Sequence, residues 1–276
     1  MGKIDSGFSK WYEKFFYVCL ALVVLTGLTA CASGGGYDAS RSTEVVTDSD
    51  EPEVRKRAKI RLQLAVGYFE QGQTTIALDE IKQALVTDPA FADAFNLRGL
   101  IYMRLNDMRL ADESFRRAMS LNPNDANVLH NYGWMLCQQA RYVESGQAFS
   151  RAVANPTYGG RAKTWMTQGL CQVRAGQLME AEHSLGKSYE LDAGNPITGY
   201  NLALLLYGRS EFMRSQFYIR RLNNSELANA ESLWLGIKVE RRLSNNEAMQ
   251  QLAEQLRKRY PQSRELQAFE RSAFDE

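Results

Sequence analysis

Apolar side chains recur at three- and four-residue spacing from about Val54 onward, a pattern that predicts a succession of short amphipathic helices. A small residue returns in this pattern about every 34 residues, at Ala65, Gly99, Gly133, Gly169, Ala203 and Gly236. A second small residue follows each of these twelve positions later, at Ala77, Ala111, Ser145, Ala181, Ser215 and Ala248. Because only small side chains let two helix backbones approach closely, this register predicts pairs of tightly packed helices.

A period of 34 residues is typical of tetratricopeptide repeats, in which each repeat is one helix pair. Pro89, Pro123 and Pro261 fall at the same phase and end the second helix of their blocks. We therefore predict an all-α fold, a right-handed superhelical solenoid of six tetratricopeptide helix pairs with a C-terminal capping helix. The expected repeats cover about 58–91, 92–125, 126–160, 161–195, 196–228 and 229–262, and the cap covers 263–276.

Such a solenoid offers an extended concave groove, so its expected function is to bind another protein. The second, fifth, ninth and twelfth residues of each first helix line this groove. In the first three repeats the candidate groove residues are Leu62, Val66, Phe69, Asn96, Leu100, Met103, His130 and Trp134. In the fourth repeat the same positions hold Lys163, Met166, Leu170 and Val173. An apolar groove in repeats one and two predicts a partner helix or strand. The alternative is that the solenoid's own flank covers these residues.

The N-terminus has the organisation of an export signal. Lys3, Lys10 and Lys14 precede sixteen uncharged residues, 15–30, which are followed by Cys31. Residues 28–31, Leu-Thr-Ala-Cys, have the form of a bacterial lipobox, in which the cysteine is acylated and becomes the first residue of the mature protein. The alternative is an uncleaved anchor, but the apolar run is shorter than the roughly 20 residues that span a bilayer.

This organisation predicts a lipoprotein signal peptide at 1–30, a lipidated cysteine and flexible tether at 31–53, and the helical repeat domain at 54–276. Ala32 follows the cysteine, which by resemblance to enterobacterial-type sorting favours the outer membrane. The expected location is the periplasmic face of that membrane, with acyl chains on Cys31 as the anchor.

Composition adds little chemistry to this picture. Without residues 1–30 the chain carries thirty basic and thirty acidic residues, so no strong field attracts nucleic acid. The sequence has no phosphate-binding glycine loop and no assembled Ser/His/Asp set. No cysteine pair or histidine has metal-ligand spacing. We expect no catalytic residues, metal, cofactor, nucleic acid or small-molecule substrate. For His130 the open alternatives are contact with a ligand and a solvated groove position.

Two cysteines, Cys137 and Cys171, remain after the signal and the lipidated Cys31 are set aside. They occupy the same late position in the first helices of adjacent repeats, and an exported compartment permits a disulfide. The alternative is two buried thiols that act as small apolar residues.

Several segments resemble one family. Residues 131–139 (NYGWMLCQQ), 155–158 (NPTY), 169–171 (GLC) and 233–235 (LWL) closely resemble the PilF/PilW-type lipoproteins of type IV pilus biogenesis, also called secretin pilotins. The resemblance runs from Cys31 to about Glu265 and implies a non-enzymatic protein that binds the pilus secretin and promotes its localisation and multimerisation in the outer membrane. The rival function is a tetratricopeptide lipoprotein adaptor of envelope maintenance, in outer-membrane protein assembly or as a scaffold for a peptidoglycan hydrolase or protease.

Overall fold

The computed structural model describes residues 50–274, and its helices lie in the unit Pro52–Glu276. The described residues contain helices and no strand, which confirms the predicted all-α class. The helices are α2 (Glu53–Glu70), α3 (Thr74–Thr87), α4 (Ala92–Arg104), α5 (Met108–Leu121), α6 (Ala126–Gln138), α7 (Tyr142–Val153), α8 (Arg161–Arg174), α9 (Leu178–Leu191), α10 (Pro196–Gly208), α11 (Phe212–Asn223), α12 (Ala230–Arg242), α13 (Asn246–Arg259) and α14 (Arg264–Glu270). None of these helices is both long enough and apolar enough to cross a membrane.

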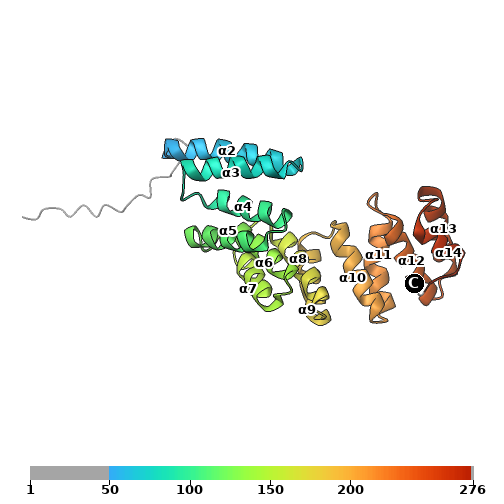
Figure 1. Cartoon of the computed structure of the whole chain (residues 1–276). Coiled ribbons are helices and arrows are strands. Elements are labelled where there is room, and N and C mark those ends of the chain that lie inside the picture. The colour runs from blue at the N-terminus through green and yellow to red at the C-terminus, as the bar shows by residue number, and fades with distance from the viewer. Residues whose placement is uncertain (1–49, 275–276) are drawn as a thin grey trace, which may run out of the picture. The chain divides into compact units, whose positions relative to one another are not determined.

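The helices form six successive pairs, and each pair lies beside the next in chain order (Figure 1). We call the even-numbered helices α2 to α12 the A helices and their partners α3 to α13 the B helices. Each A helix packs on its own B helix and on the neighbouring A helices, and from α4 onward also on the preceding B helix. This arrangement confirms the tetratricopeptide solenoid.

The predicted close contacts lie where the small residues recur. A β-carbon added to Gly99 would lie 2.6 Å from the ring of Phe115, and one added to Gly133 would lie 2.9 Å from the ring of Phe149. The small residues of the B helices are fully buried in five of the six repeats, at Ala77, Ala111, Ser145, Ala181 and Ser215. The hydroxyl of Ser145 donates a hydrogen bond of 2.7 Å to the carbonyl oxygen of Gly133, so serine serves there as well as alanine.

The turn inside each pair contains a residue in the left-handed conformation, which is how helices commonly end. Glycine occupies this position in two pairs, at Gly72 (φ 78°) and Gly176 (φ 75°). In the other four pairs the residues are Asn106, Ala140, Ser210 and Ser244. Ala140, at φ 58°, carries a β-carbon without a polar side chain to compensate for the strain.

The C-terminal end of the solenoid is closed by α14, which begins at the N-cap Ser263. Leu266 is buried in a cluster with residues of α12 and α13, and Phe274 stacks on Trp234 with ring centroids 5.3 Å apart. The helix itself ends at Glu270, so Phe274 reaches this cluster from the turn after the helix and not from its face. Together these contacts cover the apolar end that the last repeat would otherwise expose.

Candidate partner-binding surface

The predicted groove of repeats one and two is only partly open. Leu62, Phe69 and Leu100 are half-buried and pack against the apolar core that α2, α3 and α4 share. Met103 packs against the next core cluster in the same way. Val66 is the exception, because 38% of its surface is exposed. Most of the apolar side chains assigned to this groove therefore contribute to packing as well.

Two of these groove positions are also engaged by neighbouring repeats. The guanidinium of Arg104 lies 3.6 Å from the ring centroid of Phe69 and donates a hydrogen bond to its carbonyl oxygen. The side-chain oxygen of Asn96 accepts a hydrogen bond of 3.0 Å from Asn131. These contacts join adjacent A helices, so the solenoid's own side chains cover much of the predicted apolar surface.

His130 is not a groove residue, and the prediction that it faces a ligand or solvent is wrong. Its surface is only 6% exposed, and its ring packs against Phe149 with centroids 5.9 Å apart. The ring Nδ1 lies 2.9 Å from the hydroxyl oxygen of Thr164 in α8. Burial, followed by repulsion from Lys163, lowers the pKa of His130 from 6.5 to about 4. His130 is thus a neutral packing residue between repeats three and four.

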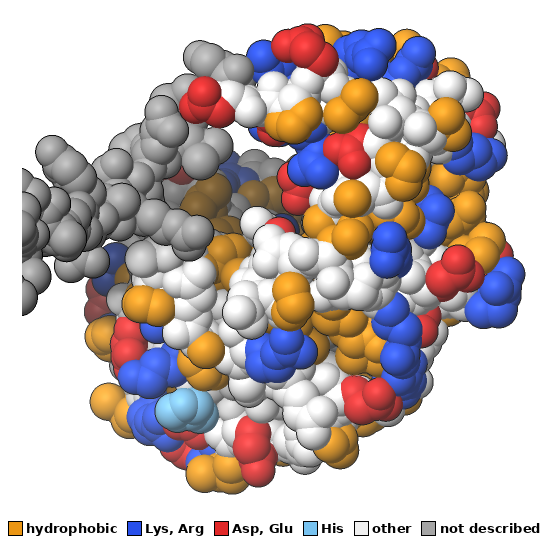
Figure 2. Space-filling view, turned by 90° about the vertical axis from the view of Figure 1, so that its left-hand side faces the viewer, with side chains coloured by type: hydrophobic (Ala, Val, Ile, Leu, Met, Phe, Trp, Pro, Cys, Tyr) orange, Lys and Arg blue, Asp and Glu red, His pale blue; other side chains and the backbone are white. Residues whose placement is uncertain are grey.

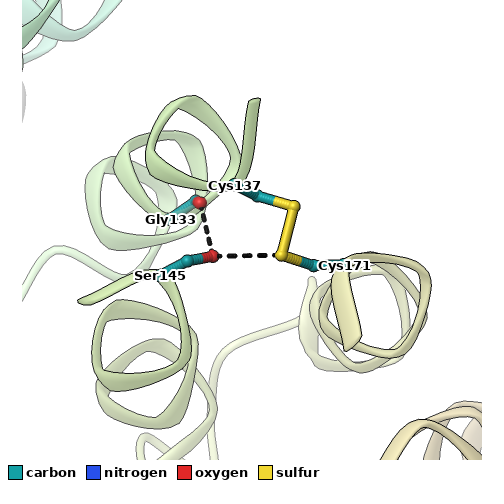
Figure 3. Close-up of a disulfide and its surroundings, with 4 residues drawn as sticks. All are labelled: Gly133, Cys137, Ser145 and Cys171. Atoms are coloured by element: carbon teal, nitrogen blue, oxygen red, sulfur yellow. Dashed lines mark hydrogen bonds between the residues drawn. A yellow bond between two sulfur atoms is a disulfide. The ribbon is translucent and has the colours of Figure 1, made fainter. Parts of the chain in front are cut away.

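A disulfide also joins repeats three and four. Cys137 in α6 and Cys171 in α8 are bonded, with their Cα atoms 5.9 Å apart (Figure 3). The hydroxyl of Ser145 in α7 lies 3.5 Å from the sulfur of Cys171. The structure thus contains the bridge and not the pair of free thiols. In the chain-entropy account, closing a loop of this length stabilises the fold by roughly 4 kcal/mol.

Trp134 stands one turn before Cys137 on α6 and is half-buried. The guanidinium of Arg174 in α8 lies 5.0 Å from its ring. The indole is thus partly exposed and partly packed at the junction of α6 with α8.

The first helix exposes an apolar face that the sequence pattern assigned to packing. Ile60 and Leu64 continue the three- and four-residue spacing of α2, yet 58% and 48% of their surfaces are exposed. The reason is that α2 contacts only α3 and α4 among the described helices, so no preceding repeat covers its outer side. A periodic pattern therefore predicts burial correctly only where a neighbouring repeat exists on both sides.

Repeats four and five expose apolar side chains at groove positions that are not covered. Val173 near the end of α8 is 39% exposed, and Ile197 and Leu204 on α10 are 49% and 41% exposed. The second position of α10 is Ile197 and the ninth is Leu204, so both follow the groove rule that the sequence suggested. We call Val66, Val173, Ile197 and Leu204 the A-helix face. In Figure 2 the apolar side chains of the face in view form separate groups between charged ones.

The aromatic residues of α10 extend this face. Tyr200 and Tyr207 are half-buried, and the ammonium of Lys238 in α12 lies 5.7 Å from the ring of Tyr207 and 5.5 Å from that of Trp234. Burial raises the pKa of Tyr200 above its ordinary value, and the nearby Glu231 raises it further. Tyr200 and Tyr207 are the fifth and twelfth residues of α10, so the same position count along the sequence identifies them as groove residues.

Within residues 50–274 no cluster of His, Cys, Asp or Glu side chains could hold a metal ion. The described surface combines apolar and aromatic side chains with cations, which suits contact with a protein segment.

Comparisons with known proteins agree with the fold and extend it. Two tetratricopeptide repeat models match residues 92–125 and 114–147. The type IV pilus assembly protein PilF of Pseudomonas aeruginosa is 29% identical over 251 residues, which cover 91% of this chain and 96% of that protein.

Two solved structures are similar over nearly their whole length. The structure of Pseudomonas aeruginosa PilF has a TM-score of 0.69 and 30% identity, and the match covers 79% of this chain and 99% of that one. The structure of PilW, described as a widely conserved type IV pilus biogenesis factor, has a TM-score of 0.68 and 31% identity with the same coverage.

Proposed function

The chain belongs to the family of tetratricopeptide proteins of type IV pilus biogenesis that includes PilF and PilW, and from this premise we propose that it is an outer-membrane lipoprotein that binds the pilus secretin and promotes its multimerisation. Its role is to bind and position a protein and not to catalyse a reaction. The observation that carries this proposal is the match to both relatives along almost their full length, together with the uncovered apolar side chains of the A-helix face.

The lipid anchor is proposed from sequence, because Cys31 and the signal at 1–30 lie outside the described residues. Acylation of Cys31 would attach the chain to the membrane, and residues 32–53 would then act as the tether to the helical repeats. The test is Cys31→Ala. We expect this variant to lose labelled palmitate and membrane attachment and to keep its helical circular dichroism, since the helices begin at Glu53. Equal palmitate incorporation by the variant would refute the anchor.

We propose the A-helix face as the surface for the secretin. Val173 and Leu204 are 39% and 41% exposed, so a carboxylate there costs the free protein little. A partner that covers these side chains with apolar groups would leave the carboxylates desolvated and unpaired, which is costly for binding. Leu62 and Leu100 are less suitable for this test, because both pack against the core and their replacement would also destabilise the fold.

The experiment compares two double variants in a strain that lacks the wild-type gene. Val173→Asp with Leu204→Asp should abolish secretin multimers on a heat-resistant gel while helicity and membrane attachment persist. The matched control is Val143→Asp with Met179→Asp, which makes the same change at B-helix residues that are 73% and 64% exposed. The control should keep normal multimer levels. Full multimerisation with the first double variant would place secretin binding elsewhere.

A further inference from the structure

The helix that closes the solenoid also lines a second candidate site. Helices α12 and α14 lie side by side at the C-terminal end of the solenoid (Figure 1). Between them is a cavity of about 520 Å³, within the range of about 300–1,000 Å³ that is usual for ligand sites. We call it the cap pocket and define it by Trp234, Lys238, Arg264, Glu265, Gln267 and Arg271.

Trp234 forms a fixed floor for the cap pocket. Only 8% of its surface is exposed, and its indole stacks on the ring of Phe274 with an interplanar angle of 26°. The guanidinium of Arg241 lies 3.8 Å from the ring centroid of Phe274 and supports this stack. Because these contacts already hold the indole, binding does not have to order it. An aromatic floor also keeps water from one side of a charge above it, which strengthens ion pairs there.

Three cations surround this floor. The ammonium of Lys238 lies 5.5 Å from the ring of Trp234. Arg264 and Arg271 are exposed and stand at the two ends of α14. Their spacing of two helical turns puts both on one face of the helix, about 10 Å apart along its axis. The Nε of Arg271 donates a hydrogen bond of 3.3 Å to the carbonyl oxygen of Gln267, which holds this side chain against its own helix.

The carboxylates near the pocket leave it positive. Glu265 is the acidic residue among those that line it, so three cations and one carboxylate give a net charge of +2. Burial raises the pKa of Tyr200, and Glu231 and Glu265 raise it further, which places both carboxylates toward α10. The carboxylate of Glu240, also on α12, pairs with Arg220 of α11 at 2.7 Å and does not line the pocket. Two carboxylates from a ligand would therefore neutralise the cap pocket.

The cap pocket continues the A-helix face. Lys238 is the ninth residue of α12, which is the position that Leu204 occupies on α10. The ammonium of Lys238 also lies 5.7 Å from the ring of Tyr207, so this side chain spans the two A helices. A protein segment that follows the A helices thus reaches the pocket without leaving the surface. This continuity favours a protein ligand over a lipid headgroup.

We propose that the cap pocket binds an acidic, extended segment of a partner protein through two of its side-chain carboxylates. In an extended segment the side chains of residues i and i+2 lie on one side, about 7 Å apart. Carboxylates at this spacing accept hydrogen bonds from Arg264 and Arg271, whose long stems let the guanidinium groups approach each other. Lys238 then balances the charge of Glu265. The proposal holds whether or not the partner is the secretin, because it assigns a different part of the groove.

The test measures binding of a rhodamine-labelled peptide, Ser-Asp-Ser-Asp-Ser with blocked ends, to the full-length chain in mild detergent by fluorescence anisotropy. The comparison peptide has asparagine in place of each aspartate. We expect saturable binding of the first peptide at low salt and at least about tenfold weaker binding of the second. Added salt should weaken binding of the first peptide, because its ion pairs are partly exposed.

The variants separate local from overall charge. Arg264→Gln with Arg271→Gln should weaken binding of the acidic peptide at least about tenfold. The matched control, Arg257→Gln with Lys258→Gln, removes two cations from exposed positions of α13 that do not line the pocket, and should leave the affinity nearly unchanged. Glu265→Gln removes the carboxylate of the pocket itself and should strengthen binding about threefold. Thermal melts establish that every variant is folded.

Three results would overturn the proposal directly. They are absent binding, equal binding of the two peptides, and undiminished binding by the variant Arg264→Gln with Arg271→Gln. Val173→Asp with Leu204→Asp should leave peptide binding unchanged, so failure of the cap pocket and failure of the secretin surface are distinguishable.

Two other occupants are tested in the same way. Asp275 and Glu276 lie outside the described residues, so a chain that ends at Phe274 is also measured. Peptide binding confined to this shorter chain would assign the pocket to the chain's own end and overturn the proposal. Phosphatidylglycerol vesicles are mixed with the Cys31→Ala chain, with and without the two arginines. Arginine-dependent binding of vesicles but not of the peptide would assign the pocket to lipid headgroups and overturn it too.

Discussion

Acid should weaken the junction between repeats three and four through His130. The hydroxyl of Thr164 lies 3.1 Å from the carbonyl oxygen of Gly160 and 2.9 Å from the Nδ1 of His130, so the neutral ring has a hydrogen-bond partner inside the junction. Acid must add a second proton to this buried ring. The resulting cation would be buried and repelled by Lys163, which is why the pKa of His130 falls to about 4.

The sign and size of the effect follow from this pKa. Because the folded-state value lies below the ordinary 6.5, the unfolded chain binds the proton first as the pH falls. The stability that depends on neutral His130 is complete above about pH 6.5 and is lost as the pH falls toward 4. Each pH unit in this window removes about 1.4 kcal/mol, so about 2.5 kcal/mol should be lost by pH 4.5.

The assay is urea unfolding followed by circular dichroism at several pH values between 7.5 and 4.5. His130→Gln removes the titrating group, while the acidic residues titrate equally in both chains and cancel in the difference. The free energy of unfolding of the wild type relative to this variant should fall by about 2.5 kcal/mol across the range. His183→Gln, at an exposed position, is the matched control. A difference between wild type and His130→Gln that stays constant with pH would refute the reasoning.

Three further predictions concern a close packing contact, a strained turn and a buried ion pair. Gly133→Leu should lower stability by about 3 kcal/mol or more, because even a β-carbon there would lie 2.9 Å from Phe149; an unchanged melting temperature would show that the close contact is not where the structure has it. Ala140→Gly should raise stability by about 0.5–1 kcal/mol by relieving the left-handed backbone at φ 58°, and a lower urea midpoint would contradict this. Arg220→Ala should cost about 3 kcal/mol, because Glu240 is 1% exposed and 2.7 Å from that guanidinium; adding Glu240→Gln should recover most of the loss, and no recovery would count against a buried-charge penalty.

The repeat register could be predicted from the sequence because it depends on local volume. A glycine such as Gly99 is required wherever a bulky residue of the partner helix, here Phe115, fills the space of the missing side chain. The same kind of constraint recurs in every repeat, so six weak signals reinforce one another. The turns at Gly72 and Gly176 depend on backbone conformation instead, because glycine adopts the left-handed region without a β-carbon clash.

The candidate surface was harder to predict, because exposure depends on long side chains from other repeats. Phe69 is covered by Arg104, which comes 35 residues later in the chain. His130 is buried because α8 lies against α6 at that point, and position counting along α6 alone cannot detect a neighbour. Ile60 is exposed because α2 is the first described helix of the stack. Periodicity along one helix predicts which side chains share a face. Whether that face is buried depends on residues of the neighbouring repeats.

The bridge between Cys137 and Cys171 also changes how the solenoid can respond to mechanical force. A chain pulled from its two ends transmits tension through the sulfur atoms, so the segment between the two cysteines, whose sequence separation is 34, cannot extend even after its helices melt. At about 3.5 Å per residue, the crosslink withholds roughly 120 Å of contour length. A stretched oxidised chain should therefore stop short of a reduced one by this length, and a reductant added under tension should release it in a single step.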